Sequence, residues 1–476
     1  MKLFELCEYA KIYCPRHLCE LEITGVTCDS RRVKPGDLFV CIKGLHSDGN
    51  DHAQEAIAAG ALAVLSDRRR DLDLFCDDAK GAFAHLCRAM YGGGIEKLKL
   101  IGVTGTNGKT SVTAMLRSIF DAAGHKTASI GTLGCFSPKG KLDGEISGSM
   151  TTPDTEMLYG LLSRLAKDGA EYVFMEISSH SLAEKKVDAL HFDVGIFTNF
   201  SRDHLDFHEN EENYFEAKKR LFALSDKMIV NADDPRLDAL ENTLSCSARK
   251  AARYMAKDVT YYGADGCGYV FLSEHCRFAI VSRIAGRFTV MNTLLAAACA
   301  TEMGIEPDFI KQGIHGLSCV EGRMERVLLD GADFSVYIDY AHTPDALENI
   351  LLTVKGFTEG KIILVFGCGG DRDRGKRPEM ARIASRLADK IIITSDNSRG
   401  EDPEQIFSDI LVGISKNADC ELIRDRKEAI EKAMLLAGRG DTLLLAGKGH
   451  EKYEIDADGK HPFDEAAVAR AAFEKR

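Results

Sequence analysis

Short apolar segments alternate with helical patterns along most of this chain. In the first 95 residues, an apolar strand pattern at 37–42 precedes a helical pattern at 53–59 and a second strand pattern at 61–65. Short apolar runs bounded by polar turns are typical of buried strands. Strands separated by helical patterns predict parallel sheets with helices on both faces. We therefore predict an α/β fold.

The same rhythm continues past a cluster of helix breakers, Tyr91-Gly92-Gly93-Gly94, which we interpret as a linker. The later strand patterns lie at 100–103, 172–177, 194–198, 228–230, 335–338, 362–366, 390–394 and 442–446, and an apolar helical pattern covers 287–300. A chain of 476 residues is too long for one hydrophobic core. We predict three domains, at 1–96, 97–322 and 323–476.

The composition argues against a nucleic-acid-binding protein, a membrane protein and a disulfide-rich protein. The formal net charge of −12 argues against a nucleic-acid partner, so an anionic substrate must meet local clusters of Lys and Arg. No apolar run approaches the roughly 20 residues of a membrane span, and the N-terminus lacks a signal-peptide pattern. None of the 15 cysteines forms a Cys-x-x-Cys pair, and Cys41, Cys87 and Cys299 stand in apolar segments. This usage is typical of small buried side chains, and we expect a cytoplasmic protein without a membrane partner.

The segment 100–110 combines an apolar strand, a glycine-rich turn and the beginning of a helix. Its turn reads Gly105-Thr106-Asn107-Gly108-Lys109-Thr110. Backbone N–H groups in such a turn bind phosphate, the lysine adds a positive charge, and the Thr110 hydroxyl is suited to Mg²⁺. Val103 stands where the general motif has its first glycine. The sequence predicts a nucleotide phosphate site here.

Two polar segments follow strands of the middle block. Glu176 lies at the end of the apolar run of the strand pattern at 172–177, where a magnesium ligand would lie, although a solvated strand-end acid is the alternative. The run 198–208 contains Asn199, Asp203 and His204. Zinc is one alternative there and simple turn polarity is another, but the oxygen ligands favour a second hard cation with one His.

Three more polar segments follow strands of the last block. They lie at 339–345, 367–378 and 447–451, and the second contains three arginines and a lysine after a glycine-rich start. Arg presents a planar fork of donors to carboxylates and phosphates. Because ligands bind at the carboxyl ends of parallel strands, we expect these segments to form one anion-binding edge. Loops with solvated charges are the alternative for each segment taken alone.

These motifs together resemble the Mur ligase family over essentially the whole chain. The matching motifs are 104–110, Thr151-Thr152-Pro153, Asn199 with Asp203-His204-Leu205-Asp206, Gly322-Arg323-Met324-Glu325 and Asp339-Tyr340-Ala341-His342-Thr343-Pro344. The family's phosphate loop also lacks the first glycine, which accounts for Val103. The resemblance implies a UDP-binding N-terminal domain, a central phosphate-loop ATPase with a mostly parallel sheet, and a Rossmann-like C-terminal domain that binds an amino acid.

The resemblance also implies a reaction. ATP, with Mg²⁺ as cofactor, phosphorylates a carboxylate, and an amine attacks the acyl phosphate to give an amide, ADP and phosphate. The chain is most similar to members that add meso-diaminopimelate to UDP-N-acetylmuramoyl-L-alanyl-D-glutamate in peptidoglycan synthesis, and we expect a monomer. Cell-wall biogenesis, cell shape and cell division would depend on that product.

Site residues follow from the same resemblance. The implied ATP contacts are Gly105, Thr106, Asn107, Gly108, Lys109, Thr110, Ser111, Asn292, Arg323 and Asp339. The implied catalytic residues are Lys109, Glu176, His204 and Lys218, and the implied Mg²⁺ ligands are Thr110, Glu176, His204 and a carbamylated Lys218. An ordinary helix-surface lysine is the alternative for Lys218. Thr289 stands where the family usually has Asn.

Two substrate sites complete the implied set. The UDP-muramoyl dipeptide would contact Ser30, Thr151, Thr152, Ser178, Glu184 and Lys186, the last two replacing a common Gln and Arg. Diaminopimelate would contact Arg372, Asp396, Asn397, Ser398, Arg399, Gly447 and Glu451, with Ser398 in place of the usual Pro.

The loop Asp396-Asn397-Ser398-Arg399 favours diaminopimelate over lysine, because lysine-adding relatives lack its arginine. A guanidinium left without the extra carboxylate of diaminopimelate would be unpaired, and this discriminates against lysine. A lysine-adding ligase remains one alternative, and a ligase similar to folylpolyglutamate synthase is another. A GTPase switch would need an Asn-Lys-x-Asp tetrapeptide after the phosphate loop, and the chain has none.

Overall fold

The computed structural model describes residues 1–44, 47–68, 71–142 and 150–476. The chain forms two compact units, each built from several segments. The first unit contains Met1–Thr104, His125–Gly195 and Glu216–Met228, and the second contains Gly105–Gly124, Ile196–Phe215 and Ile229–Arg476. The boundaries of the three expected domains, 1–96, 97–322 and 323–476, stay a prediction.

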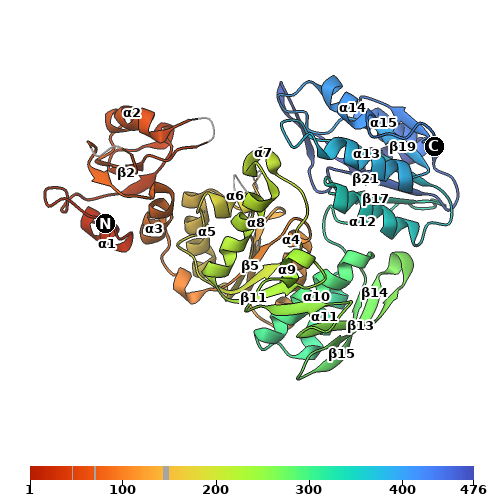
Figure 1. The fold of residues 1–476 in the computed structure, drawn as a ribbon, viewed down its shortest axis with the longest axis horizontal. Helices are drawn as coiled ribbons and strands as arrows, with labels where there is room; N and C mark the ends of the chain where they lie inside the picture. The colour runs from red at the N-terminus through yellow and green to blue at the C-terminus, as the bar shows by residue number, and fades with distance from the viewer. Residues whose placement is uncertain (45–46, 69–70, 143–149) are drawn as a thin grey trace. The chain divides into compact units, whose positions relative to one another are not determined.

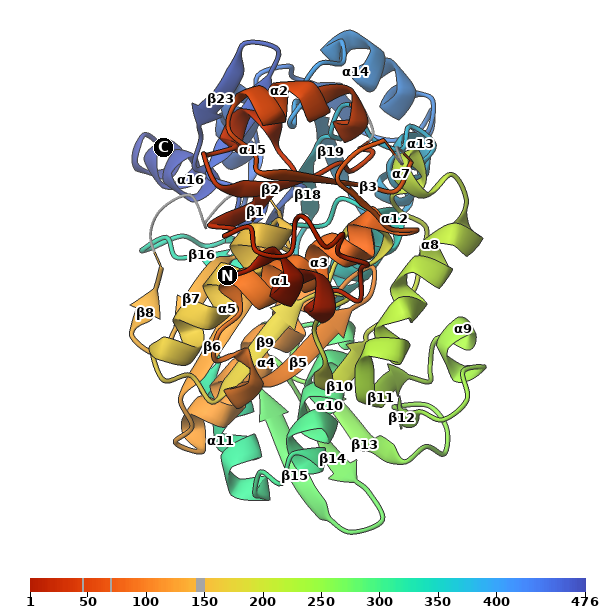
Figure 2. The same ribbon diagram turned by 90° about the vertical axis from the view of Figure 1, so that its left-hand side faces the viewer.

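The first unit begins with a small parallel sheet. Its four strands are β1 (Gly25–Thr27), β2 (Asp37–Val40), β3 (Ala63–Ser66) and β4 (Leu74–Phe75), in that order. Helices α2 (Ala53–Ala58) and α3 (Ala79–Tyr91) lie on opposite faces of it (Figure 2). Phe39 and Val64 pack against Ala53 and Ala56, so the apolar segments seen in the sequence form this core.

A second sheet segment of the first unit carries Glu176. Strand β9 (Tyr172–Glu176) pairs in parallel with β5 (Lys99–Thr104) and β6 (Thr127–Gly131), and β7 (Gly134–Ser137) and β8 (Gly140–Lys141) add antiparallel strands. All five residues of β9 are buried, as an apolar run of this kind predicts. Other helices here are α1 (Leu3–Tyr9), α5 (Thr155–Lys167) and α6 (Ser179–Ala183).

The second unit contains strands that break the β/α rhythm. Strands β11 (Ser225–Asn231), β12 (Leu244–Ser247) and β13 (Tyr254–Tyr261) are parallel, but β14 (Cys267–Leu272) and β15 (Arg277–Ser282) continue antiparallel. The expected alternation up to residue 322 is therefore wrong for this stretch. Exposed and buried residues alternate in β15, so it lacks the continuous apolar run of a strand buried on both faces.

Helices of the second unit pack closely beside its phosphate loop. They include α4 (Lys109–Ala122), α10 (Arg287–Glu302) and α11 (Pro307–Gly316). The predicted helix after the phosphate loop and the apolar helix at 287–300 are confirmed as α4 and α10. A Cβ atom added at Gly313 of α11 would lie 2.3 Å from the Ile119 Cα of α4, so the two helices meet backbone to backbone. Shorter helices are α7 (Leu205–His208) and α9 (Pro235–Asp238). Helix α8 (Glu211–Lys219) and strands β10 (Phe192–Phe197) and β11 extend across the division between units.

The end of the chain forms a six-stranded, mostly parallel sheet. Its strand order is β16 (Glu325–Val327), β17 (Ser335–Asp339), β21 (Thr442–Ala446), β18 (Ile362–Phe366), β19 (Lys390–Ile393) and β20 (Cys420–Leu422). Only the β16–β17 pair among these is antiparallel. A small hairpin of β22 (Tyr453–Asp456) and β23 (Gly459–Pro462) follows. The α/β fold with mostly parallel sheets is confirmed.

Helices cover both faces of this sheet (Figure 1). Leu364 and Phe366 share a core with α12 (Pro344–Lys355), α13 (Lys376–Leu387) and α14 (Pro403–Leu411). Ile363 and Val365 share the opposite core with α15 (Arg426–Leu436) and α16 (Glu465–Glu474). Side chains alternate between faces along a strand, so one continuous apolar run supplies both cores. The polar segments after β17, β18, β19 and β21 consequently share the carboxyl edge.

Candidate active site

The phosphate loop lies between β5 and α4 and has the backbone of an anion cradle. Gly105 and Gly108 have φ values of +142° and +86°, which side chains other than glycine rarely adopt. A Cβ atom at Gly105 would lie 1.9 Å from Thr198 Oγ1. Lys109 Nζ donates to the carbonyl oxygens of Gly105, at 2.9 Å, and Thr106, at 3.0 Å. The Lys109 side chain therefore folds back onto the loop at the N-terminus of α4. The N–H groups at a helix N-terminus stabilise a bound phosphate.

The segment after β10 braces this loop. Asn199 Nδ2 donates to the Asn107 carbonyl oxygen, at 3.0 Å, and Asn199 Oδ1 accepts from the Asn107 N–H, at 2.9 Å. Thr198 Oγ1 also donates to the Asn107 carbonyl oxygen, at 2.5 Å. The sequence interpretation gave the Asn199 oxygen to a cation, but here it holds the backbone of the phosphate loop.

Two of the expected nucleotide contacts, Arg323 and Asn292, lie beside the start of α4. Arg323 Nη2 donates to Thr110 Oγ1 at 3.1 Å. Asn292 of α10 faces the loop, because a Cβ atom at Gly108 would lie 2.7 Å from Asn292 Oδ1. Asp339 lies at the end of β17 and accepts the Met324 N–H at 2.8 Å, and its burial raises the pKa of its carboxyl. Ser111 is buried in the first turn of α4.

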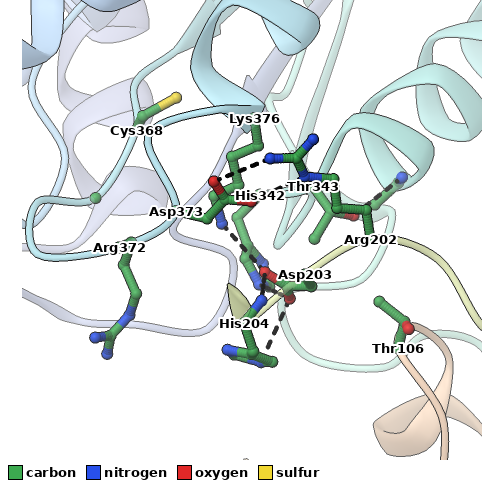
Figure 3. A network of polar contacts seen from close by, with 12 residues as sticks. Thr106, Arg202, Asp203, His204, His342, Thr343, Cys368, Arg372, Asp373 and Lys376 are labelled. Carbon is green, nitrogen blue, oxygen red and sulfur yellow. Dashed lines mark hydrogen bonds and ion pairs between the residues drawn. The ribbon is translucent and has the colours of Figure 1, made fainter. Parts of the chain in front are cut away.

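Asp203 is the centre of a polar network (Figure 3). Its carboxylate lies 3.5 Å from Lys376 Nζ, 3.8 Å from His342 Nε2 and 3.4 Å from His204 Nε2. Burial of Asp203 opposes ionisation, but Lys376, His204 and His342 outweigh it and hold the pKa of this carboxyl far below its usual range. The Asp203 oxygens, which the sequence interpretation offered to a cation, are thus paired with protein groups.

A second ion pair joins the segment 198–208 to the segment 367–378, which Asp203 and Lys376 also connect. Arg202 Nε donates to Asp373 Oδ2 at 3.1 Å. Asn107 Nδ2 of the phosphate loop also donates to Asp345 Oδ2 of α12, at 3.0 Å. Within the second unit, the phosphate loop and the 198–208 segment are therefore connected to the last block by several polar contacts.

The residues expected to bind the amino acid come together at the carboxyl ends of β18, β19 and β21. The Gly370 N–H donates to the Asn397 carbonyl oxygen at 2.9 Å, which joins the first two loops. A Cβ atom at Gly447 would lie 2.7 Å from Asp396 Oδ2, so the third loop approaches through a glycine with φ of +114°. Ser398 is nearly buried, and Arg372 Nη1 donates to the Asp371 carbonyl oxygen at 3.0 Å.

Charged groups of both signs line these loops. Glu451 Oε2 accepts from Asn397 Nδ2 at 2.7 Å, and Glu451 Oε1 accepts from the Tyr340 hydroxyl at 3.3 Å. Burial, and then the charge of Asp396, raise the pKa of Glu451. Arg399 has a φ of +52° and donates from Nη1 to the Gly370 carbonyl oxygen at 2.9 Å. The arrangement suits a ligand with both ammonium and carboxylate groups.

Sequence reasoning gave no role to several residues of this region. Tyr340 contacts Glu451 and also lies under Arg323, whose guanidinium carbon is 4.6 Å from the ring centre. Lys448 and Arg426 are fully buried. Lys448 bonds to the Asn397 side chain and Arg426 to the Ser395 carbonyl oxygen, so both support the loop after β19. Tyr340 and Lys448 stand in motifs that the sequence displays, but nothing in the sequence distinguishes Arg426 from a solvated helix residue.

Glu176 and three expected substrate contacts form a cluster in the first unit. Glu176 is 2% exposed and accepts from the Thr132 N–H and hydroxyl, both at 2.9 Å. Thr152 Oγ1 donates to the Glu176 carbonyl oxygen at 2.9 Å and accepts the Ser178 N–H at 3.1 Å. Thr151 Oγ1 lies 3.3 Å from Thr132 Oγ1. The solvated-acid alternative for Glu176 is wrong, since the carboxylate is buried.

Lys218 is also buried, with 1% of its surface exposed, although it lies on α8 among charged residues. The alternative of an ordinary helix-surface lysine is therefore wrong. A buried lysine is costly unless its charge is paired or removed.

A cavity of about 670 Å³ opens beside β1 and β2 in the first unit. Ser30, Glu184 and Lys186 line it, so three of the six expected substrate contacts lie in one cavity. Lys186 Nζ bonds to Asp154 at 2.9 Å and lies 3.1 Å from Glu184. The two acids outweigh burial and raise the pKa of Lys186. Asp29 and Arg31 form a further ion pair at the cavity wall.

The side chains present allow the zinc and magnesium alternatives to be compared. Over the described ranges, no group of three or more His, Cys, Asp and Glu side chains is arranged to hold a metal ion. Such a cluster is what zinc would need in the 199–208 run. Magnesium needs only one or two protein ligands besides phosphate oxygens and water, and the Thr110 hydroxyl and the Glu176 carboxylate are, each taken by itself, of a chemical type suited to it.

The parallel sheets, the glycine-rich phosphate loop and the charged loops at the strand ends are typical of a nucleotide-binding α/β enzyme. Family models agree along the chain, matching the Mur ligase family catalytic domain at 22–87, the Mur ligase middle domain at 103–300, and the Mur ligase glutamate ligase domain at 322–449. The chain belongs to the Mur ligase family and is an ATP-dependent, amide-forming ligase.

Individual relatives are similar over the full length. Proteins of Syntrophomonas wolfei and Caldanaerobacter subterraneus are each 40% identical to this chain, over 98% and 94% of both sequences. Both are named UDP-N-acetylmuramoyl-L-alanyl-D-glutamate--2,6-diaminopimelate ligase. A solved structure of a ligase with that name is 32% identical, with a TM-score of 0.70 over 100% of this chain and 99% of that one.

The length and hydropathy of the helices show whether any of them could span a membrane. Among the residues that the structure describes, none of the helices has the length and apolar character needed to span a bilayer.

Proposed function

We propose that this ligase joins meso-diaminopimelate to the D-glutamate carboxylate of UDP-N-acetylmuramoyl-L-alanyl-D-glutamate. The observation that carries the proposal is the loop Asp396–Arg399. It presents a guanidinium and a carboxylate beside the half-buried Glu451, in a sheet edge that belongs to the same unit as the phosphate loop. Diaminopimelate has two ammonium and two carboxylate groups, and this charge pattern is complementary to it.

The reaction starts from a carboxylate, which is a poor electrophile. Phosphorylation by ATP supplies a leaving group, the amine of the amino acid then attacks the acyl phosphate, and the tetrahedral intermediate loses phosphate. The loop N–H groups of 105–110, Lys109 and Arg323 would stabilise the charge that develops on the transferring phosphoryl group. Asn292 and Asp339 would contact the rest of the nucleotide.

Magnesium fits this chemistry. Thr110, Glu176 and His204, with Lys218 as a carbamate, are the residues that we propose to hold it. When bound, Mg²⁺ neutralises phosphate charge and orients the reacting oxygens. Carbamylation would also convert the buried Lys218 cation into an anion suited to such a cation.

The cavity beside β1 is the proposed site of the UDP group. Ser30 lines it, and Lys186, which is paired with Glu184 and Asp154, offers a cation to an anionic substrate. Thr151, Thr152 and Ser178 would contact the muramoyl peptide. Because ATP and UDP-linked precursors are cytoplasmic metabolites, we place the reaction in the cytoplasm and propose that a monomer carries it out.

Mass spectrometry of the product tests the acceptor. The enzyme is incubated with ATP, Mg²⁺, the UDP-muramoyl dipeptide and an equimolar mixture of meso-diaminopimelate and L-lysine. We expect the diaminopimelate tripeptide in large excess. Comparable kcat/KM for L-lysine would refute the assignment of the amino acid. Phosphate release with a folate acceptor instead would favour the ligase similar to folylpolyglutamate synthase.

A further inference from the structure

The Lys448 ammonium is buried beneath the loops that we assign to the amino acid. Its side chain is 0% exposed and follows β21. Nζ donates to Asn397 Oδ1 at 3.1 Å and to the Tyr453 carbonyl oxygen at 3.0 Å. The Asp396 carboxylate lies 3.7 Å away and that of Glu454 lies 3.9 Å away. A buried cation with this many partners is costly unless the partners keep a defined geometry.

The contacts of Lys448 determine which way the Asn397 amide faces. Asn397 Oδ1 accepts from Lys448 Nζ and from the Ile455 N–H, the latter at 2.9 Å. Its Nδ2 then faces Glu451 Oε2 at 2.7 Å. A flipped amide would place N–H groups against two donors and its oxygen against a carboxylate. The Lys448 and Ile455 donors that face Asn397 Oδ1 therefore fix the position of Asn397 Nδ2, which donates to Glu451.

This orientation decides what the site offers to a ligand. Glu451 accepts one bond from Asn397 and one from Tyr340, and the Tyr453 side chain also bonds to this carboxylate. A carboxylate has about four acceptor positions, so one remains for an ammonium group. Without Lys448, the Ile455 N–H alone would hold the Asn397 oxygen, so the amide would be fixed less firmly and Glu451 would lose part of the support for its carboxylate. The effect would reach the amino acid and leave the phosphate loop unchanged.

We propose that Lys448 is a positioning residue for the amino-acid substrate, acting through the Asn397 amide on Glu451. The inference rests on the proposed function, because it takes these loops as the amino-acid site. Lys448 makes no contact with the substrate in this scheme. Its role is to keep Asn397 and Glu451 arranged for the ammonium group.

The first test is Lys448→Met, which keeps the length of the side chain and removes its donors. We expect the KM for diaminopimelate to rise about tenfold, the effect of losing one hydrogen bond to a charged group. The KM values for ATP and the UDP-muramoyl dipeptide should change less than about twofold. A KM for diaminopimelate that stays within twofold of wild type overturns the proposal.

A double-mutant cycle tests the route through Asn397. If Lys448 acts through the amide, Lys448→Met should add little to the KM increase of Asn397→Ala. Effects that multiply would show that Lys448 acts independently of Asn397, and this also overturns the proposal. A purely structural lysine would lower activity by a similar factor in both backgrounds.

Two further variants separate positioning from stability. Lys448→Met/Glu454→Gln removes a buried acid together with the cation, and it gives a second folded protein if the single variant is unstable. The same KM increase supports the proposal, while a normal KM shows that charge balance alone mattered. Lys390→Met is the matched control, since Lys390 pairs with Asp419 at 2.8 Å and Glu421 at 3.5 Å on the same sheet away from the loops.

The outcomes also distinguish this proposal from the proposed function. Wild type that turns over neither diaminopimelate nor lysine contradicts the proposed function. Wild type that accepts lysine leaves the KM comparison intact, with lysine as the measured substrate.

Discussion

At the residue scale, several charged side chains behave differently from what their sequence neighbourhood indicates. Lys218, Arg426 and Lys448 look like solvated residues in the sequence, yet they are among the most buried in the structure. Burying a cation requires partners from distant segments, such as Glu465 for Arg426 at 2.8 Å. Arg399, which we propose to discriminate between amino acids, is different, because its motif is visible in the sequence.

Arg399→Ala tests that discrimination. We expect kcat/KM for diaminopimelate to fall about 100-fold or more, since a site built for a carboxylate loses its fork of donors. The kcat/KM for L-lysine should change less than about threefold. Steady-state phosphate release measures both.

The control for Arg399 is Arg424→Ala. Arg424 is exposed and pairs with Glu404 at the surface of the same sheet domain. Its removal should leave both rates unchanged. Equal losses for diaminopimelate and lysine in Arg399→Ala would contradict a role in recognising the extra carboxylate.

At the element scale, packing between helices depends on single glycines. Gly313 of α11 leaves no space for a Cβ atom against Ile119 of α4, whereas a Cβ atom at Gly316 would meet nothing within 4 Å. Both glycines lie in helix α11, so the two positions differ in the atoms that surround them and not in secondary structure.

We expect Gly313→Ala to lower the free energy of unfolding by about 1–3 kcal/mol, the usual cost of overpacking. Gly316→Ala should be neutral or stabilising by up to about 1 kcal/mol, because alanine favours helix over glycine. Thermal unfolding followed by far-UV circular dichroism compares them. Equal Tm values for the two variants would show that α4 and α11 can move apart freely.

The sequence predicted the elements with continuous apolar runs and missed those without them. Strands such as β18 are buried on both faces, and their hydrophobic pattern is unmistakable. β15 and the hairpin β22–β23 are short or half-exposed, so their pattern resembles a loop. The candidate site was predictable where glycines and charges follow strands. Contacts between distant segments, such as Asp203 with Lys376, were not, because they depend on the folded chain.

At the scale of the whole molecule, the polar network around Asp203 makes stability depend on pH. Burial and the nearby Lys376 ammonium lower the pKa of His342 to about 4. The unfolded histidine has a pKa of roughly 6.5. Between these values the unfolded chain binds more protons than the native one, so stability is lost as the pH falls from 6.5 toward 4.

His342→Gln should reduce this loss. We expect the difference between variant and wild type to be about 1 kcal/mol over that pH range, below the full shift because the His342 side chain is 35% exposed. Denaturant midpoints at pH 7 and pH 4.5 measure it, with circular dichroism as the probe since the chain has no Trp. A variant with the same pH dependence as wild type would assign the loss to other groups.

Tyr340 has a consequence for how an inhibitor would act. Its ring lies under Arg323, which bonds to Thr110, and its hydroxyl bonds to Glu451. One aromatic side chain thus touches a residue of each of the two ligand sites that we propose. A small molecule bound against this ring would compete with both the nucleotide and the amino acid that we propose for these sites, so an excess of either substrate should relieve the inhibition.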